Sequence, residues 1–128
     1  MSHTIKNLRD VEDSAPKFGF DAVQEARFPR KDLDAETTGL AYMKVKAGQR
    51  QPFAHKHDNA EEVYVVLSGS GRIKLDDDII DLQPLDAIRI APGVTRSVEG
   101  GPDGIEYLAF GAHHDGDGEI VKDPGFWG

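Results

Sequence analysis

From Gly39 onward, hydrophobic and polar residues alternate in short segments that end at glycine, proline or aspartate. The segment GLAYMKVKA, residues 39–47, places Met43 and Val45 on one side and the intervening lysine on the other. This period of two is that of a half-buried β-strand. Further strand-like segments are EVYVVL, RIKLD, DIIDL, DAIRIA, VTRSVE and IEYLAFGA. Many short strands separated by turns predict an all-β sandwich or barrel.

Turn-forming residues indicate where these strands should end. Ser68–Gly69–Ser70–Gly71 is expected to end the most apolar strand, and GGPDG at 100–104 is expected to form a loop. The three aspartates at 76–78 suit the tip of a hairpin between RIKLD and DIIDL. The segment AHHDGDGE, from residue 112, has the composition of a solvated exit loop.

Residues 1–38 have no sustained pattern. Within them DAVQEARF, residues 21–28, is compatible with a short helical turn or an irregular edge strand. We therefore expect an irregular N-terminal arm, residues 1–38, that packs on or extends a barrel formed by residues 39–128. A chain of 128 residues fits a single domain.

Composition narrows the classes of partner. The formal net charge of −8 makes a surface that follows nucleic-acid phosphates or anionic membranes improbable. The chain has no cysteine, so disulfides and thiolate ligands are excluded. The lack of cysteine is compatible with a reducing compartment. No apolar run approaches the roughly 20 residues of a membrane helix. We expect a cytoplasmic protein that binds neither nucleic acid nor membrane.

The stretch AHKHDNAEEVY, residues 54–64, carries the candidate chemistry. In an extended strand His55 and His57 point to the same side, which Gln51 and Phe53 share. Glu62 follows inside an apolar strand, where an unpaired carboxylate is unfavourable. Two imidazoles and one carboxylate suit zinc, iron, manganese or nickel and leave positions open for a ligand. The alternative is a solvated polar turn between two strands.

These residues resemble the first conserved motif of the cupin superfamily, a glycine followed by HxH, a glutamate and a second glycine. The motif falls here on Gly48, His55, His57, Glu62 and Gly69, with one residue more than usual before His55. The second motif resembles PLDAIRIAPGVTRSVEG, where Ala91–Pro92–Gly93 replaces the usual Pro-x-Gly. The resemblance implies a single-domain double-stranded β-helix, or jelly-roll barrel, with the motif residues lining a pocket. It also implies a homodimer.

The sequence departs from the family at Arg96, which stands where metal-binding cupins carry a fourth, histidine ligand. Arginine has no acceptor and cannot replace that ligand. An anionic ligand bridging the metal and Arg96 would accommodate its charge. Alternatively, no metal is present and Arg96 pairs with Glu62. His113 or His114 is a further candidate for the missing ligand.

Two functions follow from this reading. The first is a small-molecule pocket with a divalent metal on His55, His57 and Glu62 and an anionic or polyol ligand near Arg96. The expected ligand contacts also include Gln51, Phe53 and Tyr64; Gln51 could instead support the metal ligands. The second is a metal-free binding or sensor module with a Glu62–Arg96 pair. The sequence leaves open whether the protein is an enzyme, and no catalytic residue is assigned.

Overall fold

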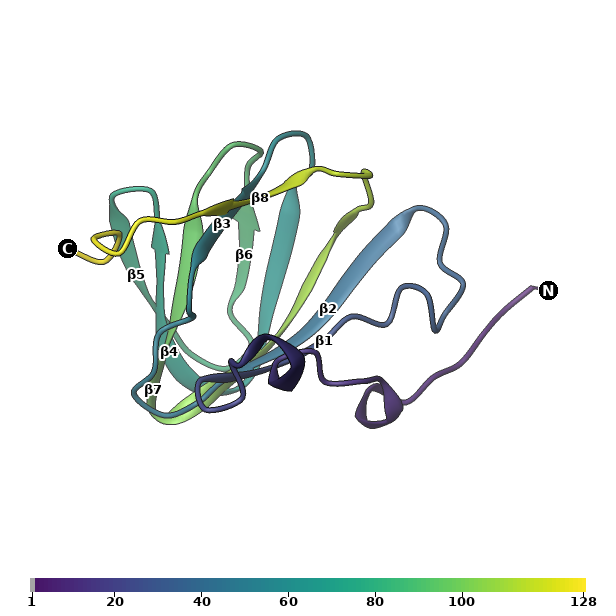
Figure 1. Ribbon diagram of the computed structural model, residues 1–128, viewed down its shortest axis with the longest axis horizontal. Coiled ribbons are helices and arrows are strands. Elements are labelled where there is room, and N and C mark those ends of the chain that lie inside the picture. The colour runs from purple at the N-terminus through teal and green to yellow at the C-terminus, as the bar shows by residue number, and fades with distance from the viewer. Residues whose placement is uncertain (1) are drawn as a thin grey trace.

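The computed structural model describes residues 2–128 and confirms an all-β barrel (Figure 1). Two 3-10 turns, η1 and η2, precede eight strands. Their bounds are η1 Leu8–Asp10, η2 Pro16–Phe18, β1 Gln24–Arg27, β2 Thr38–Val45, β3 Ala54–His57, β4 Glu62–Leu75, β5 Asp78–Leu82, β6 Ala87–Ile90, β7 Arg96–Ala112 and β8 Gly118–Val121. No helix among the described residues is long and apolar enough to cross a membrane.

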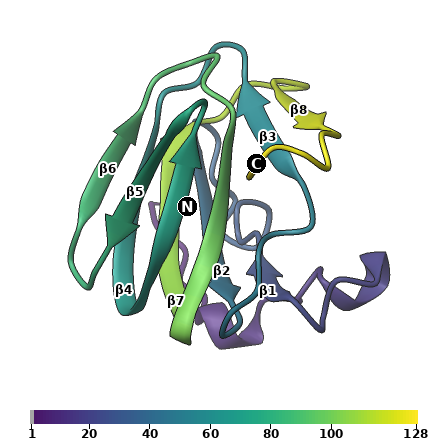
Figure 2. The ribbon, with the colours of Figure 1, turned by 90° about the vertical axis from the view of Figure 1, so that its left-hand side faces the viewer.

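The two longest strands, β4 and β7, form the centre of the sheet and pair with each other in antiparallel register. β7 also pairs with β2, which carries β1 on its other edge, and β4 also pairs with β5 and β6. β3 joins β7 at a single residue pair and carries β8 on its free edge. Figure 2 shows β3 and β8 facing the β4–β5–β6 side across the interior.

The alternation read from the sequence selects the interior. Met43 and Val45 of β2 are buried, as predicted, whereas Lys44 is partly exposed. Antiparallel strands with one covered face keep apolar side chains inward and polar ones outward. The rest of the core is Ala26, Tyr64, Val66, Ile73, Leu82, Ile90, Val98, Ile105, Tyr107 and Ala109.

The segment Ser68–Gly71 bends a strand and does not end it, which corrects the sequence prediction. β4 continues to Leu75, with register shifts between Val66 and Ser68 and between Gly69 and Gly71. Gly69 has φ +74°, and a Cβ there would lie 2.1 Å from the Gly104 carbonyl oxygen. Glycine permits both this conformation and this approach. The bends let the two halves of β4 pair with different parts of β7.

The GGPDG loop prediction is also wrong. Residues 100–104 lie within β7, which is 17 residues long. A Cβ at Gly100 would lie 2.4 Å from the Lys46 carbonyl oxygen, so these glycines serve close backbone approach. The predicted hairpin tip at 76–78 is confirmed, because β4 pairs with β5 on either side of it.

The two ends of the chain add strands to the barrel. Within DAVQEARF, residues 21–23 form a turn and Gln24–Arg27 form the edge strand β1, which pairs residue by residue with β2. At the other end part of the predicted exit loop is strand β8, which pairs with β3. The tail then crosses towards β4 (Figure 1), where the Trp127 ring lies 4.8 Å from the Arg50 guanidinium carbon and 5.8 Å from that of Arg72 in β4.

Candidate metal centre

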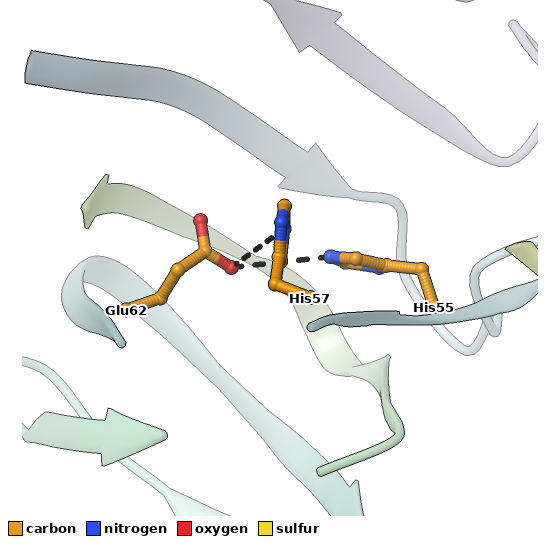
Figure 3. Close-up of side chains that lie close together, drawn as sticks. All are labelled: His55, His57 and Glu62. Carbon is orange, nitrogen blue, oxygen red and sulfur yellow. Dashed lines mark ion pairs between the residues drawn. The ribbon is translucent and has the colours of Figure 1, made fainter. Parts of the chain in front are cut away.

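Two strands that follow each other in the chain but do not pair with each other, β3 and β4, bring the three predicted ligands together across the interior of the barrel. His55 and His57 extend from the same side of β3, and Glu62 is the first residue of β4. Figure 3 shows both imidazoles directed at the carboxylate. Glu62 Oε1 lies 3.3 Å from His57 Nε2 and 4.0 Å from His55 Nε2. One ligand atom from each residue lies within 4.8 Å of the others.

Arg96 lies directly beside Glu62. Its Nη2 donates to Glu62 Oε1 at 2.6 Å, and its Nη1 donates to the Val94 carbonyl at 2.7 Å. The position follows from the sheet, since Arg96 begins β7 opposite His55 of β3. The side chain is fully buried, as the inward parity of Val94 and Val98 predicted, and Arg96 is absent from the described lining of the cavity.

The surroundings shift the pKa values of the three candidate ligands in different directions. Burial, and then the nearby Arg96 charge, lower the pKa of His55 to about 4, so its imidazole is neutral at pH 7. The hydrogen bond with Glu62 raises the pKa of His57 despite an opposing effect of burial. Burial also disfavours the Glu62 carboxylate, but His57 and Arg96 together lower the pKa of Glu62 overall. The site therefore offers a neutral imidazole and an ionised carboxylate.

This donor set fits a divalent transition metal. Ligand atoms about 2.0–2.2 Å from one ion are separated from each other by roughly 3–3.5 Å. The 3.3 Å separation of His57 Nε2 and Glu62 Oε1 already meets this, whereas His55 Nε2, 4.0 Å from Oε1, would have to move closer to bind the same ion. The remaining lone pairs of the Glu62 carboxylate leave it able to hold Arg96 and a metal together. His55, His57 and Glu62 are the residues that would hold the ion.

A cavity of about 680 Å³ opens beside these ligands. Gln51, Phe53 and Tyr64, predicted as ligand contacts, all line it. Gln51 also braces the wall, since its Nε2 donates to Tyr107 Oη at 3.1 Å and its Oε1 accepts from the Val98 amide at 3.0 Å. The Tyr64 ring stacks on Tyr107 at 4.9 Å.

Two other histidines predicted as substitute ligands lie elsewhere on the lining. His113 and His114 border the cavity, but His113 Nε2 contacts Asp115 at 2.8 Å. Neither belongs to the cluster of potential metal ligands found among residues 2–128. The described part of the chain thus supplies three ligands from histidine and glutamate, not four.

Three polar residues near this site were not predicted from the sequence. Asp117 is buried and its Oδ2 lies 3.4 Å from His57 Nδ1, although the two residues are far apart in the sequence. Arg30 and Lys31, from the segment between β1 and β2, line the cavity. No local pattern marks these residues, because their positions at the cavity depend on how distant parts of the chain pack together.

Comparisons with known proteins agree with this fold. The family model described as "Cupin domain" matches residues 41–101, which include all three candidate ligands and Arg96. No curated protein matches the sequence. A cupin protein from Bacteroides fragilis superposes with a TM-score of 0.71 and 23% identity, covering 100% of this chain and 96% of its own.

Two enzymes of known structure share the architecture. The polyketide cyclase RemF from Streptomyces resistomycificus has a TM-score of 0.76 and 18% identity, covering 96% of this chain and 88% of its own. Oxalate decarboxylase from Bacillus subtilis has a TM-score of 0.75 and 20% identity over 94% of this chain. The match spans only 33% of that decarboxylase. Identities this low show a common fold and leave the chemistry to the site itself.

Proposed function

We propose that this chain, whose residues 41–101 match the cupin-domain model, is a member of the cupin superfamily, and that its barrel binds a small molecule beside a divalent transition metal. His55, His57 and Glu62 would hold zinc, iron, manganese or nickel. The observation that carries the proposal is the convergence of their ligand atoms within 4.8 Å at the wall of a cavity of about 680 Å³. Such an ion supplies Lewis acidity to an oxygen of a bound ligand.

Arg96 has a defined task in this site. Its 2.6 Å bond to Glu62 Oε1 fixes the carboxylate, and its burial keeps this arrangement away from solvent. Two neutral histidines, one carboxylate and a divalent ion sum to +1, and Arg96 raises this to +2. In a half-enclosed site such a charge favours an anionic ligand.

The class of ligand follows from the rest of the lining. Arg96, expected to orient an anion, is occupied by Glu62 and the Val94 carbonyl. Arg30 and Lys31 are the cationic side chains that line the cavity, whose other walls include Phe53 and Leu40. We therefore propose a ligand with a carboxylate or similar anionic group near the metal or Arg30 and a largely apolar body. A polyol is the alternative ligand.

A second function is favoured by one contact. The Glu62–Arg96 ion pair balances the charge of the fully buried arginine without any metal, although Arg96 Nε has no hydrogen-bond partner among the described residues. On this reading the protein is a metal-free binding or sensor module, and the histidines hydrogen-bond to the small molecule. The two functions differ in whether the pure protein takes up one equivalent of metal.

Metal content decides between them. The untagged protein should bind about one equivalent of zinc or manganese by elemental analysis, and the ion should raise its melting temperature. Less than about a tenth of an equivalent, with no thermal shift, would rule out the metal centre. Arg96→His should tighten metal binding at least about tenfold, because it removes a positive charge and adds a ligand. Arg89→His, at an exposed arginine paired with Glu61, is the matched control.

The ligand class has its own assay. A panel of carboxylates with increasingly large apolar groups, compared with the matching alcohols and with sugars, should raise the melting temperature in order of anionic charge and apolar size. Arg30→Gln and Lys31→Gln should each reduce the shift, whereas Arg89→Gln should not. A preference for neutral polyols that is unaffected by these substitutions would contradict an anionic ligand.

A further inference from the structure

Asp117 joins the C-terminal segment to the turn that links the two metal-binding strands. Its Oδ1 accepts hydrogen bonds from the Asn59 amide at 2.7 Å and from Asn59 Nδ2 at 3.0 Å. Its Oδ2 accepts from the Ala60 amide at 3.0 Å and lies 3.4 Å from His57 Nδ1. The side chain is only 3% exposed. Burial disfavours the charged form, but these hydrogen bonds lower the pKa of Asp117 overall.

His57 consequently lies between two carboxylates, one at each ring nitrogen. Nε2 faces Glu62 at 3.3 Å, and Nδ1 faces Asp117 at 3.4 Å. An ionised carboxylate only accepts hydrogen bonds, so it favours a proton on the nitrogen that it faces. Without a metal this applies at both nitrogens, whereas a bound ion would take the place of the proton on Nε2 and leave the proton on Nδ1 beside Asp117.

The chain packs a second element against the same ring. Gly118, the first residue of β8, pairs with His57 across the β3–β8 ladder. A Cβ built at Gly118 would lie 3.5 Å from His57 Cε1, so the ring rests against the backbone of β8. Asp117 and Gly118 thus define both the direction and the plane of the imidazole.

We propose that Asp117 is a positioning residue of the metal centre, which holds the His57 proton on Nδ1 and directs Nε2 towards Glu62 and the ion. The inference rests on the proposed metal-binding function. His55 provides an internal comparison, because among residues 2–128 its one carboxylate contact is with Glu62, at 4.0 Å. The C-terminal segment is then part of the site although it contributes no ligand.

Because Asp117 also supports the turn, its metal role must be separated from its effect on folding. Asp117→Asn keeps the shape but removes the charge and one acceptor. Asn59→Ala removes one hydrogen bond to Asp117 and leaves the carboxylate facing His57, so it is the control for a loosened turn. Asp115→Asn, at an exposed acid of the same loop, controls for a change in charge.

The test combines zinc titration calorimetry with NMR of histidine labelled with ¹⁵N. Asp117→Asn should weaken zinc binding about 10- to 100-fold, the usual effect of losing such a partner. The Nδ1–H signal of His57 should then move or exchange rapidly with water, while that of His55 stays. Both control variants should bind zinc within about twofold of the unmodified protein. A folded Asp117→Asn variant with unchanged affinity and an unchanged His57 signal would overturn the inference.

Two further outcomes distinguish a failure of the Asp117 contact from a failure of the proposed metal site. If the unmodified protein binds no zinc, the proposed function fails, but the Nδ1–H signal of His57 in metal-free protein still tests the Asp117 contact. If Asp117→Asn does not fold, the role of Asp117 is tested by proton exchange in the unmodified protein. Its His57 Nδ1 proton should exchange with water at least about tenfold more slowly than that of His55. Equal exchange rates would contradict the assignment.

Discussion

The ion pair between Glu62 and Arg96 should be strongly coupled in the metal-free protein. Arg96 is fully buried, its partner Glu62 has a side chain only 15% exposed, and 2.6 Å separates Nη2 from Oε1. Arg96→Met would leave a nearly buried carboxylate without its cation and the Val94 carbonyl without its donor. Breaking a buried pair on one side costs about 3–5 kcal/mol. For a chain of this size that corresponds to a fall in melting temperature of roughly 10–20 °C.

A double-mutant cycle measures the coupling. Urea unfolding of the chelator-treated protein should show that Arg96→Met and Glu62→Leu each lower the free energy of unfolding by about 3 kcal/mol or more. The double variant should be more stable than the sum of the single effects predicts, because it leaves neither charge buried alone. A coupling energy of about 2–4 kcal/mol is expected.

The same chain contains a control pair of the same chemistry. Arg89 and Glu61 also form an arginine–glutamate contact, at 3.0 Å, but both side chains are more than half exposed. Their cycle, Arg89→Met with Glu61→Leu, should give at most about 1 kcal/mol. Equal coupling in the two cycles, or additive effects at Glu62 and Arg96, would refute the view that burial makes this ion pair a strong one.

Other parts of the structure give shorter predictions. In the metal-free protein, the free energy of unfolding should fall as the pH drops from 6.5 towards 4, because His55 takes up a proton in the unfolded chain but not in the folded one. The contribution of His55 to this fall is at most about 3 kcal/mol. The substitution His55→Gln should therefore flatten this part of the plot of urea midpoint against pH. Gly69→Ala should lower the free energy of unfolding in urea by at least about 2 kcal/mol, because the new Cβ would meet a backbone oxygen. Gly48 also has a positive φ but lies in open space, so Gly48→Ala should lower it by only about 1 kcal/mol. Trp127→Ala should lower the melting temperature modestly, since it removes about 1 kcal/mol of stacking with Arg50. The homodimer expected from the family resemblance predicts a mass by light scattering of about twice the 14.0 kDa of one chain.

The three candidate metal ligands could be grouped from the sequence because they lie close together along it. His55 and His57 share a side of one strand through the period of two, and Glu62 begins the next strand after a short turn. Local geometry fixes such a group once the strands are recognised. The inward orientation of Arg96 was also predicted, from the parity of its neighbours.

The glycine segments show where local reasoning failed. A run such as Ser68–Gly71 has the composition of a turn, and composition alone does not distinguish a turn from a bulge in a long strand. The distinction depends on Gly104, whose carbonyl lies where a side chain of residue 69 would be. That contact exists only after β4 has paired with β7.

By itself, the sequence determined the alternation that makes an all-β barrel, the side of β3 that carries the histidines, and the presence of an inward-facing arginine at position 96. Only the tertiary structure decided that Arg96 bonds to Glu62 and that Asp117 lies beside His57. The physical reason is the same in both cases. Local periodicity sets which way a side chain points, whereas its partner is set by the register of strands that are distant in the sequence. The pairing of β8 with β3, which brings Asp117 to the site, could therefore not be predicted from the sequence.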